Sequence, residues 1–388
     1  MPQDKFDSDV AIVGGGPVGL YLAGRLLQND ISVTILEQKT SIDQHSKSLG
    51  IHPVSMERFE EAGIVDEFLN KGLKIETGVA FLDHLEIGDV SFKSCPKPYN
   101  FILALPQFQT EAILENWVTT LNPSTLTRGA TVTEINQHTE GVNVQFSKNG
   151  ENKKLTCRFL IGCDGKNSFV REQVSIEIQG KAYPDTYVMG DFSDNTDFGT
   201  KAAVYLHKSG LIESFPLPNS HRRWVVKTDK YINEPSRNLI EELIQKRIGH
   251  SLEDEQNFMI SSFGVQHQLA KKFYSGRILL AGDAAHVVSP IGGQGMNLGW
   301  ITADFCAKSV TDVMRLSAPM EKTFSSYSNR SRKLANQVAK RAEMNMFLGR
   351  KRRTNMFFKP AVSLLIKTPI SKLLARIFTM RGLGSWPV

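Results

Sequence analysis

The amino-terminal part of the chain carries a glycine cluster whose spacing is typical of a site for dinucleotide phosphates. Residues 14–19 read Gly-Gly-Gly-Pro-Val-Gly, which fits the pattern G-x-G-x-x-G. In this pattern Gly14 permits a tight turn, Gly16 lets a pyrophosphate approach the backbone, and Gly19 lets the following helix pack closely on a strand. The helix start offers N–H groups and the positive end of its dipole to the phosphates. Glu37 can accept hydrogen bonds from both ribose hydroxyls and would repel a 2′-phosphate, so the site favours FAD or NAD over NADP.

Two later segments each place an acidic residue at the end of an apolar strand. Asp164 follows the predicted strand at 155–161, and Asp283 follows the predicted buried strand at 277–280. The segment 290–297 is rich in glycine and opens another helix. Its glycines would let backbone N–H groups close on a flat ligand. The dipole of that helix would favour negative charge that develops on the ligand.

With these three segments in this order and spacing, the sequence resembles the class A flavoprotein monooxygenases of the para-hydroxybenzoate hydroxylase fold. The segment Leu105-Pro106-Gln107-x-x-x-Glu111 also matches that family, and the resemblance covers roughly residues 8–330. It implies that FAD is the cofactor. The residues expected to bind it are Gly14, Gly16, Pro17, Val18, Gly19, Glu37, Gln38, Lys47, Gln107, Val132, Asp164, Asp283, Pro290, Gly293, Gly295, Met296 and Asn297.

The resemblance implies that different residues of this set bind different parts of FAD. The first glycines and Glu37 would bind the ADP half, and the backbone of Val132 would contact the adenine. Asp283 would meet the ribityl chain or the pyrophosphate, and residues 290–297 would lie beside the isoalloxazine. Asp164 belongs to a segment that these enzymes use for both FAD and NAD(P)H. Lys47 departs from the pattern, because many relatives carry an arginine there and lysine lacks the planar fork that grips a phosphate bidentately.

The resemblance implies an FAD-dependent monooxygenase that uses NADH or NADPH and O2 to hydroxylate a small aromatic or polycyclic compound. The reduced flavin would form a C4a-hydroperoxide that attacks an electron-rich carbon, while the protein orients and desolvates the reactants. The sequence contains no defensible Ser-His-Asp arrangement and no H-E-x-x-H, so it predicts no protein nucleophile and no metal site, and it leaves the catalytic residues unassigned. The substrate would lie between an antiparallel sheet and the flavin. Phe215, Pro216 and Trp224 are candidate wall residues, and a place in the core of the sheet fits them equally well.

Three other functions fit the same motifs, because the motifs specify FAD binding rather than turnover. One is a flavin-dependent reductase of the same superfamily; a halogenase is disfavoured, since the chain has no W-x-W-x-I-P segment. Another is a quinone-pathway hydroxylase that works at the membrane surface. The third is a non-catalytic flavoprotein that binds its ligand without turning it over.

The elements that must position these residues begin with a βαβ unit. Residues 9–13 and 31–36 read as buried strands, and an apolar helical pattern runs between them through 20–27. This order predicts a parallel sheet with a right-handed crossover. Residues 187–227 alternate like an antiparallel sheet, and strand chemistry of the first kind returns at 277–280. A nucleotide-binding domain interrupted by an antiparallel sheet is therefore expected.

The expected fold class is α/β, with three parts. A Rossmann-like FAD-binding domain with a parallel sheet is discontinuous in sequence, and a substrate domain with an antiparallel sheet is inserted in it. Helices follow at the carboxyl-terminal end. The predicted boundaries are 1–75, 101–180 and 270–330 for the FAD-binding domain, 76–100 and 181–269 for the substrate domain, and 331–388 for the helical region.

Length and composition agree with a globular protein of about this complexity. The chain has 388 residues, of which 41% are hydrophobic and 22% charged, so disorder, collagen and coiled coil are excluded as the main architecture. Its four cysteines are irregularly spaced and form no C-x-x-C pair, which disfavours a zinc module and fits a reducing cytoplasm. The amino-terminal residues form no secretory signal, and no apolar run approaches the roughly 20 residues of a spanning helix.

The positive charge of the chain is concentrated at its carboxyl-terminal end. The net charge is +6, but residues 350–388 contain nine Lys or Arg and no Asp or Glu, which leaves residues 1–349 with −3. A uniformly basic nucleic-acid binder is therefore disfavoured. Two interpretations of 350–388 remain open. Its apolar side packs on the protein body, or it makes a peripheral contact with an anionic membrane surface.

Overall fold

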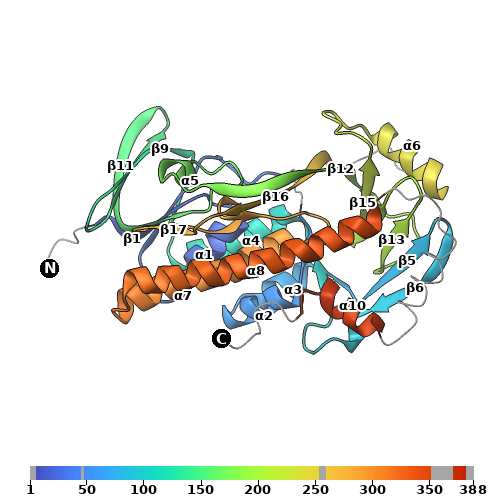
Figure 1. Ribbon diagram of the computed structural model, residues 1–388, viewed down its shortest axis with the longest axis horizontal. Coiled ribbons are helices and arrows are strands. Elements are labelled where there is room, and N and C mark those ends of the chain that lie inside the picture. Colours follow the sequence, from blue (N-terminus) through green and yellow to red (C-terminus); the bar gives the residue numbers. More distant parts are fainter. Residues whose placement is uncertain (1–5, 45–47, 253–258, 351–369, 382–388) are drawn as a thin grey trace.

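Two large sheets and one small sheet organise the chain (Figure 1). The computed structural model describes residues 6–44, 48–252, 259–350 and 370–381. The predicted α/β architecture, with a parallel and an antiparallel sheet, is confirmed. The division into domains at the expected boundaries stays a prediction, although strands from 77–91 and 178–270 do share one sheet.

The parallel sheet is the core of the amino-terminal unit. Strand β1 lies between β2 and β11 in register, with Val10 opposite both Val33 and Phe159. Residues Val10 to Ile12 are fully buried, as expected for a strand covered on both faces. The strand order is β17 (Tyr274–Ser275), β18 (Ile278–Leu280), β11 (Glu151–Gly162), β1 (Ser8–Val13), β2 (Val33–Glu37) and β8 (Leu126–Arg128), and β10 (Val142–Lys148) and β9 (Ala130–Gln137) extend from β11 as an antiparallel hairpin.

Helices cover this sheet and connect its strands. Helix α1 (Pro17–Leu27) joins β1 to β2 as predicted and packs on α4 (Gln107–Leu121) and α7 (Gln294–Arg315). Helix α8 (Met320–Gly349) extends from the parallel sheet to the antiparallel one (Figure 1), with Phe324 in the first core and Met346 in the second. The shorter helices are α2 (Pro53–Glu61), α3 (Val65–Lys71), α5 (Phe169–Gln173) and the 3-10 turn η2 (Gly282–Ala284).

The second sheet has a different core on each face. One face packs on α6 (Arg237–Ile248), and the other faces the glycine-rich segment that contains Ile291 (Figure 1). Its strand order is β19 (His286–Val287), β16 (Met259–Ala270), β12 (Ile178–Ser193), β15 (His221–Thr228), β14 (Ile212–Leu217), β13 (Ala202–Leu206), β5 (Thr77–Leu82) and β6 (Leu85–Ser91), antiparallel throughout except for β13 beside β5.

A small antiparallel sheet lies between the two large ones. It is formed by β3 (Gly50–Ile51), β7 (Ile102–Ala104) and β4 (Leu73–Ile75), and both β4 and β7 contact β14. Because β3 leads through His52 into α2, and β4 and β7 contact β14, this small sheet connects α2 to the antiparallel sheet.

The described part of the carboxyl-terminal region packs on the protein body. Helix α10 (Ile370–Phe378) lies against β6 and the 3-10 turn η1 (Phe92–Ser94), and Ala375 is fully buried in a cluster with Val90 and Phe92. Residues 351–369 and 382–388, which carry much of the basic sequence, lie outside the described residues. In the part of the chain that the structure describes, no helix combines the length and apolar character needed to cross a bilayer.

Candidate active site

The three motif segments meet at the carboxyl ends of the parallel strands. Gly14 follows β1 and has φ +106°, and a methyl group added there would lie 2.4 Å from the carbonyl oxygen of Cys163, which follows β11. A methyl group at Gly282, after β18, would lie 3.1 Å from Cγ1 of Val18 in α1. The close approach of the two backbones therefore requires glycine at position 14, and the positive φ of +61° favours glycine at position 282. This approach brings the first, second and third motifs to one edge of the sheet.

The first glycine loop leaves open space where a phosphate would lie. A methyl group at Gly16 would meet nothing within 4 Å, and no side chain caps the amino-terminal end of α1. The carboxylate of Glu37 accepts a hydrogen bond from the Gly15 N–H at 2.6 Å and one from the Lys39 N–H at 2.8 Å. It is therefore fixed beside the loop, at the end of β2, where a ribose would follow the phosphates. These residues fit the ADP half of a dinucleotide.

The second motif has a positioning role within the protein. The Asp164 carboxylate accepts hydrogen bonds from the Ser168 hydroxyl at 2.6 Å and from the Val170 N–H at 3.0 Å, which fixes the start of α5. The buried Arg171 guanidinium donates to the carbonyls of Ala284 and Lys166, each at 3.0 Å. The expected contact of Asp164 with a dinucleotide stays a prediction. The hydrogen bond from Arg171 to Ala284 in the third motif was not predicted, since nothing in the sequence around Arg171 indicates this distant partner.

Asp283 is a carboxyl group at the open edge of the site. Its side chain is exposed, yet the surrounding protein displaces much of its water, and this desolvation raises its pKa to about 6. The positive charge of Lys166 acts in the opposite direction. The carboxyl therefore titrates close to physiological pH, at the place where the resemblance puts the ribityl chain or pyrophosphate.

The segment that begins α7 contains an unsatisfied amide. Gly293 has φ +65° and precedes the first turn of α7, which no side chain caps. Gln294 is fully buried, and neither its amide oxygen nor its amide nitrogen has a hydrogen-bond partner within the described ranges of the chain. Because a buried amide without partners is costly, a ligand with donors and acceptors would stabilise this segment. Pro290 is exposed, and Gly293, Gly295 and Met296 are half-buried beside it.

The side chain of Asn297 forms hydrogen bonds within the protein, and its expected place beside the cofactor stays a prediction. It is fully buried, and its Oδ1 accepts from the His52 N–H at 2.8 Å and the Ser55 hydroxyl at 2.7 Å. Its Nδ2 donates to the carbonyls of Gly50 and Gly293, each at 2.8 Å. Both ends of the amide are thus used inside the protein. Asn297 is a positioning residue that attaches the glycine-rich segment to β3 and α2.

The remaining expected residues lie around the first loop. Gln107 starts α4, where its side-chain amide donates to Glu111 at 2.8 Å and its Oε1 accepts the Ser48 N–H at 3.4 Å. Gln38 is exposed immediately after Glu37, and Pro17 and Val18 form the first turn of α1. Val132 is nearly buried in β9, which contacts β2. Lys47 lies outside the described residues.

The buried histidines of the site are held neutral. Burial lowers the pKa of both His52 and His286 to about 4. The Nε2 atom of His286 lies 2.9 Å from the Thr302 hydroxyl, in the core behind Asp283. Among the described residues, no group of three or more His, Cys, Asp or Glu side chains has the geometry of a metal site.

One face of the antiparallel sheet turns toward the glycine-rich segment, and this corrects the predicted wall. Ile291 shares an apolar cluster with Tyr187, Met189 and Val225 of this face, and Phe215 is half-buried against that cluster. Trp224 instead stacks on His250 with ring centroids 5.1 Å apart and belongs to the opposite core under α6. Pro216 alternates with Phe215 along β14 and so points to that opposite side as well.

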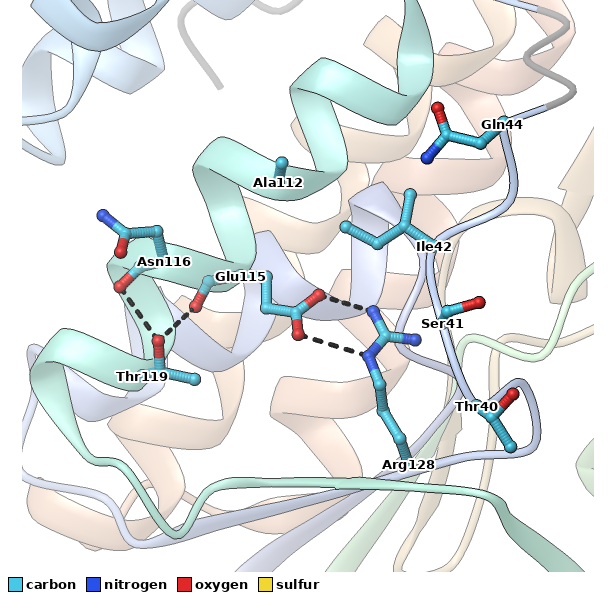
Figure 2. Close-up of a pocket in the computed structure, with 9 residues that line it drawn as sticks. All are labelled: Thr40, Ser41, Ile42, Gln44, Ala112, Glu115, Asn116, Thr119 and Arg128. Atoms are coloured by element: carbon cyan, nitrogen blue, oxygen red, sulfur yellow. Dashed lines mark hydrogen bonds and ion pairs between the residues drawn. The ribbon is translucent and has the colours of Figure 1, made fainter.

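A polar hollow of about 660 Å³ lies beside the loop that follows Glu37 (Figure 2). Arg128 and Glu115 line it and form two hydrogen bonds, at 3.2 and 2.5 Å, so the guanidinium is already paired with a carboxylate. The other residues around it are Thr40, Ser41, Ile42, Gln44, Ala112, Asn116 and Thr119. A smaller cavity of about 150 Å³ lies where Gln44, the start of α4 and the antiparallel sheet meet.

Comparison with known families agrees with this geometry. The profile of the FAD binding domain family matches residues 7–342. An uncharacterized aromatic compound monooxygenase, YhjG of Bacillus subtilis, is 32% identical over 320 residues, which cover 80% of this chain and 63% of that protein. The 6-methylpretetramide 4-monooxygenase of Streptomyces rimosus is 28% identical over 81% of this chain and 58% of its own length. The chain thus spans about three fifths of these curated relatives.

Solved structures show the same fold. The p-nitrophenol 4-monooxygenase PnpA of Pseudomonas putida superposes with a TM-score of 0.89 at 20% identity. The match covers 98% of this chain and 99% of that one. At this identity the similarity concerns the fold, including both sheets and their connection.

Proposed function

The chain belongs to the FAD-binding-domain family of the flavin-dependent aromatic monooxygenases, and from this premise we propose that it hydroxylates a small aromatic or polycyclic compound with O2 and NADH or NADPH. The observation that carries the proposal is the contact of Ile291 with Tyr187, Met189 and Val225. It places a buried, mostly apolar sheet face next to the segment where an isoalloxazine would lie. An aromatic substrate would bind where this apolar face meets the glycine-rich segment.

The residues present fit FAD at three places. Gly16 leaves space for a pyrophosphate, Glu37 is fixed where a ribose would lie, and Gln294 has an amide without partners. Bound FAD would supply the electron transfer and the activation of O2. The chain itself would hold the phosphates at the start of α1 and direct the positive end of the α7 dipole toward the isoalloxazine. The apolar sheet face would exclude water from the reacting ring.

The names of the relatives agree with an aromatic substrate. The first is called an aromatic compound monooxygenase and the second acts on 6-methylpretetramide. We extend only the class of compound to this chain, because it spans about three fifths of those proteins.

Purification followed by substrate screening tests the proposal. The protein should purify with a flavin spectrum, and NADH or NADPH oxidation should be slow until an aromatic substrate accelerates it. Mass spectrometry should then find a product that is heavier by one oxygen atom. A product that has gained two hydrogens instead would indicate a reductase. Saturable binding without any turnover, across a panel of phenols and polycyclic aromatics, would indicate a ligand-binding flavoprotein.

A further inference from the structure

An isolated carboxyl group lies within the apolar sheet face that turns toward the glycine-rich segment. Glu213 on β14 pairs with Val225 on β15, and Val225 pairs with Met189 on β12. Paired residues of antiparallel strands point to the same face, so Glu213 shares the face of Val225 and Met189, which pack with Ile291. Only 8% of Glu213 is accessible. It has no hydrogen bond or ion pair with any residue that the structure describes.

A second unsatisfied polar group lies on the same face. Tyr187 on β12 is 1% accessible, and its buried hydroxyl has no hydrogen-bond partner in the part of the chain that the structure describes. Its ring stacks on Phe263 with centroids 5.2 Å apart, which fixes its orientation. Desolvation raises the pKa of Tyr187, and the negative charge of nearby Glu213 raises it further. Tyr187 is therefore a hydrogen-bond donor, and Glu213 is the acceptor near it.

The other charged groups on this face are already paired. Arg223 forms two hydrogen bonds to Asp191, at 2.6 and 2.7 Å. Lys227 lies 3.2 Å from Asp185, which also accepts from Arg350 at 2.7 Å. Each of these cations is neutralised by a carboxylate. Among the residues that the structure describes, this face therefore presents no unpaired cation to anchor a carboxylate on the substrate, and it favours a neutral phenol over an aromatic acid.

We propose that Glu213 accepts the proton of the substrate's phenolic hydroxyl, while the Tyr187 hydroxyl donates a hydrogen bond to the same oxygen. The O–H bond of the phenol breaks, its electron pair stays on the phenolic oxygen, and the proton moves to a carboxylate oxygen of Glu213. The resulting phenolate is richer in electrons at its ortho and para carbons, which are the positions that an electrophilic oxygen attacks. This inference rests on the proposed function and gives it a substrate class and a general base.

The proposal predicts that ligand binding takes up a proton, and this uptake can be measured as a pH dependence of affinity. Burial raises the pKa of Glu213 to about 7 and is the one cause of the shift. Above pH 7 both the empty site and a nitrophenol in solution are ionised. Two negative charges side by side in an apolar site repel strongly, so the complex must keep one proton. Binding of a nitrophenolate therefore takes up one proton from solution, and its affinity falls about tenfold for each pH unit above 7.

The experiment uses oxidised holoenzyme without NADH or NADPH, titrated with p-nitrophenol at several pH values and followed by the visible absorbance of the nitrophenolate. We expect the wild type to bind the coloured anion with an affinity that falls about tenfold for each pH unit above 7. Glu213→Gln should bind it with an affinity that does not change over this range. Glu86→Gln is the matched control, because Glu86 is an exposed carboxyl on β6 of the same sheet. It should keep the wild-type slope, and Tyr187→Phe should bind the anion more weakly with that slope.

Equal slopes in the wild type and Glu213→Gln would overturn the inference, and so would a colourless bound probe or the absence of saturable binding. Because this measurement requires no turnover, it is independent of hydroxylation. Proton-linked binding without any hydroxylated product would contradict the proposed function and leave the proton acceptor in place. Once a substrate is known, Glu213→Gln should lower the rate of hydroxylation by roughly 10²- to 10⁴-fold and abolish its dependence on a group with pKa about 7.

Discussion

The guanidinium of Arg171 donates a hydrogen bond to the carbonyl of Ala284 at 3.0 Å, across 113 positions of sequence. A second bond from the same side chain reaches the carbonyl of Lys166, also at 3.0 Å. Arg171 is buried, so these two bonds replace water around its charge. They fix the turn after β11 to the turn that carries Asp283, at the edge where the flavin would lie.

Replacing Arg171 by Ala should therefore loosen the site as well as lower stability. The buried carbonyl of Ala284 and the more exposed carbonyl of Lys166 would lose a charged donor, which costs about 1–3 kcal/mol of unfolding free energy. The variant should also lose FAD more readily during gel filtration. Arg158→Ala is a suitable control, because Arg158 forms a half-exposed ion pair with Asp9 and should contribute less than about 1 kcal/mol. Full FAD retention by the Arg171 variant would show that the tie does not shape the site.

Gly16→Glu should abolish FAD binding without unfolding the protein. The structure has free space at this position, so the side chain itself is accommodated, but it would occupy the pyrophosphate position with a like charge. The absorbance spectrum and circular dichroism of the purified variant measure the two effects separately. Gly264→Glu is the control, because Gly264 also has free space around it and lies in β16, away from the first loop. A folded Gly16 variant with a full flavin spectrum would refute the assignment of this loop.

Asp283→Asn should weaken FAD retention in a manner that depends on pH. Desolvation raises the pKa of Asp283 to about 6, so the wild-type carboxyl is ionised above that pH and takes up a proton below it. We expect the difference in FAD affinity between wild type and variant to be largest above about pH 7 and to vanish as the pH falls through 6. Fluorescence titration of the apoprotein with FAD measures this. A difference that does not vary with pH would exclude ionisation of Asp283 as its cause.

Glu213→Gln should stabilise the protein at high pH. The pKa of Glu213 is raised from 4.5 to about 7 in the folded state, so between these values the folded protein binds more protons than the unfolded chain. The free energy of unfolding of the wild type therefore falls as the pH rises through this range. The variant should be more stable by about 2–3 kcal/mol at about pH 8 and nearly equal to the wild type at about pH 5. Urea denaturation at both pH values, with Glu86→Gln as the unaffected control, tests this.

The carboxyl-terminal region should not attach the protein to membranes through α10. Ala375 is fully buried against β6 and η1, and Arg381 donates to the carbonyls of Pro96 and Tyr99 at 3.0 and 3.3 Å. A helix whose packed side already contacts the protein body, with Leu374, Ile377 and Phe378 half-buried, is less free to insert into lipid. We expect no co-sedimentation with anionic vesicles at physiological salt. Binding that disappears on deletion of residues 350–388, in a protein that keeps FAD, would instead support peripheral membrane contact.

The sequence predicted the parts of the site that are local in the chain. Gly14, Gly16 and Glu37 belong to a single βαβ unit, in which strand, turn and helix follow one another directly, and the structure places them as that unit requires. The same holds for the helix start after Gly293. In each case the chemistry depends on backbone conformation over a few residues, and glycine marks that conformation.

The residues that were missed depend on contacts distant in sequence. The partner of Arg171 lies on another strand, and the burial of Gln294 follows from packing that no local pattern shows. The sequence could not decide between wall and core for Trp224, because β14 and β15 are buried on both sides and neither strand alternates cleanly between apolar and polar residues. The burial of Glu213 was missed for the same reason, since a charged residue in a strand suggests an exposed position rather than a buried carboxyl.

Strands β12, β14 and β15 are buried on both faces. Alternate residues along each strand therefore have different roles, because one set packs on α6 and the other set forms the opposite face. Val188, Ile212 and Val226 hold the sheet to α6, whereas Met189 and Glu213 lie on the face where we propose that the substrate binds. Substitutions on the second set can reshape the binding surface while the first set keeps the scaffold intact. A library of substitutions restricted to the set of Met189 and Glu213 should change substrate preference with little loss of folded protein. This sheet is therefore an adaptable surface for natural divergence and for directed evolution.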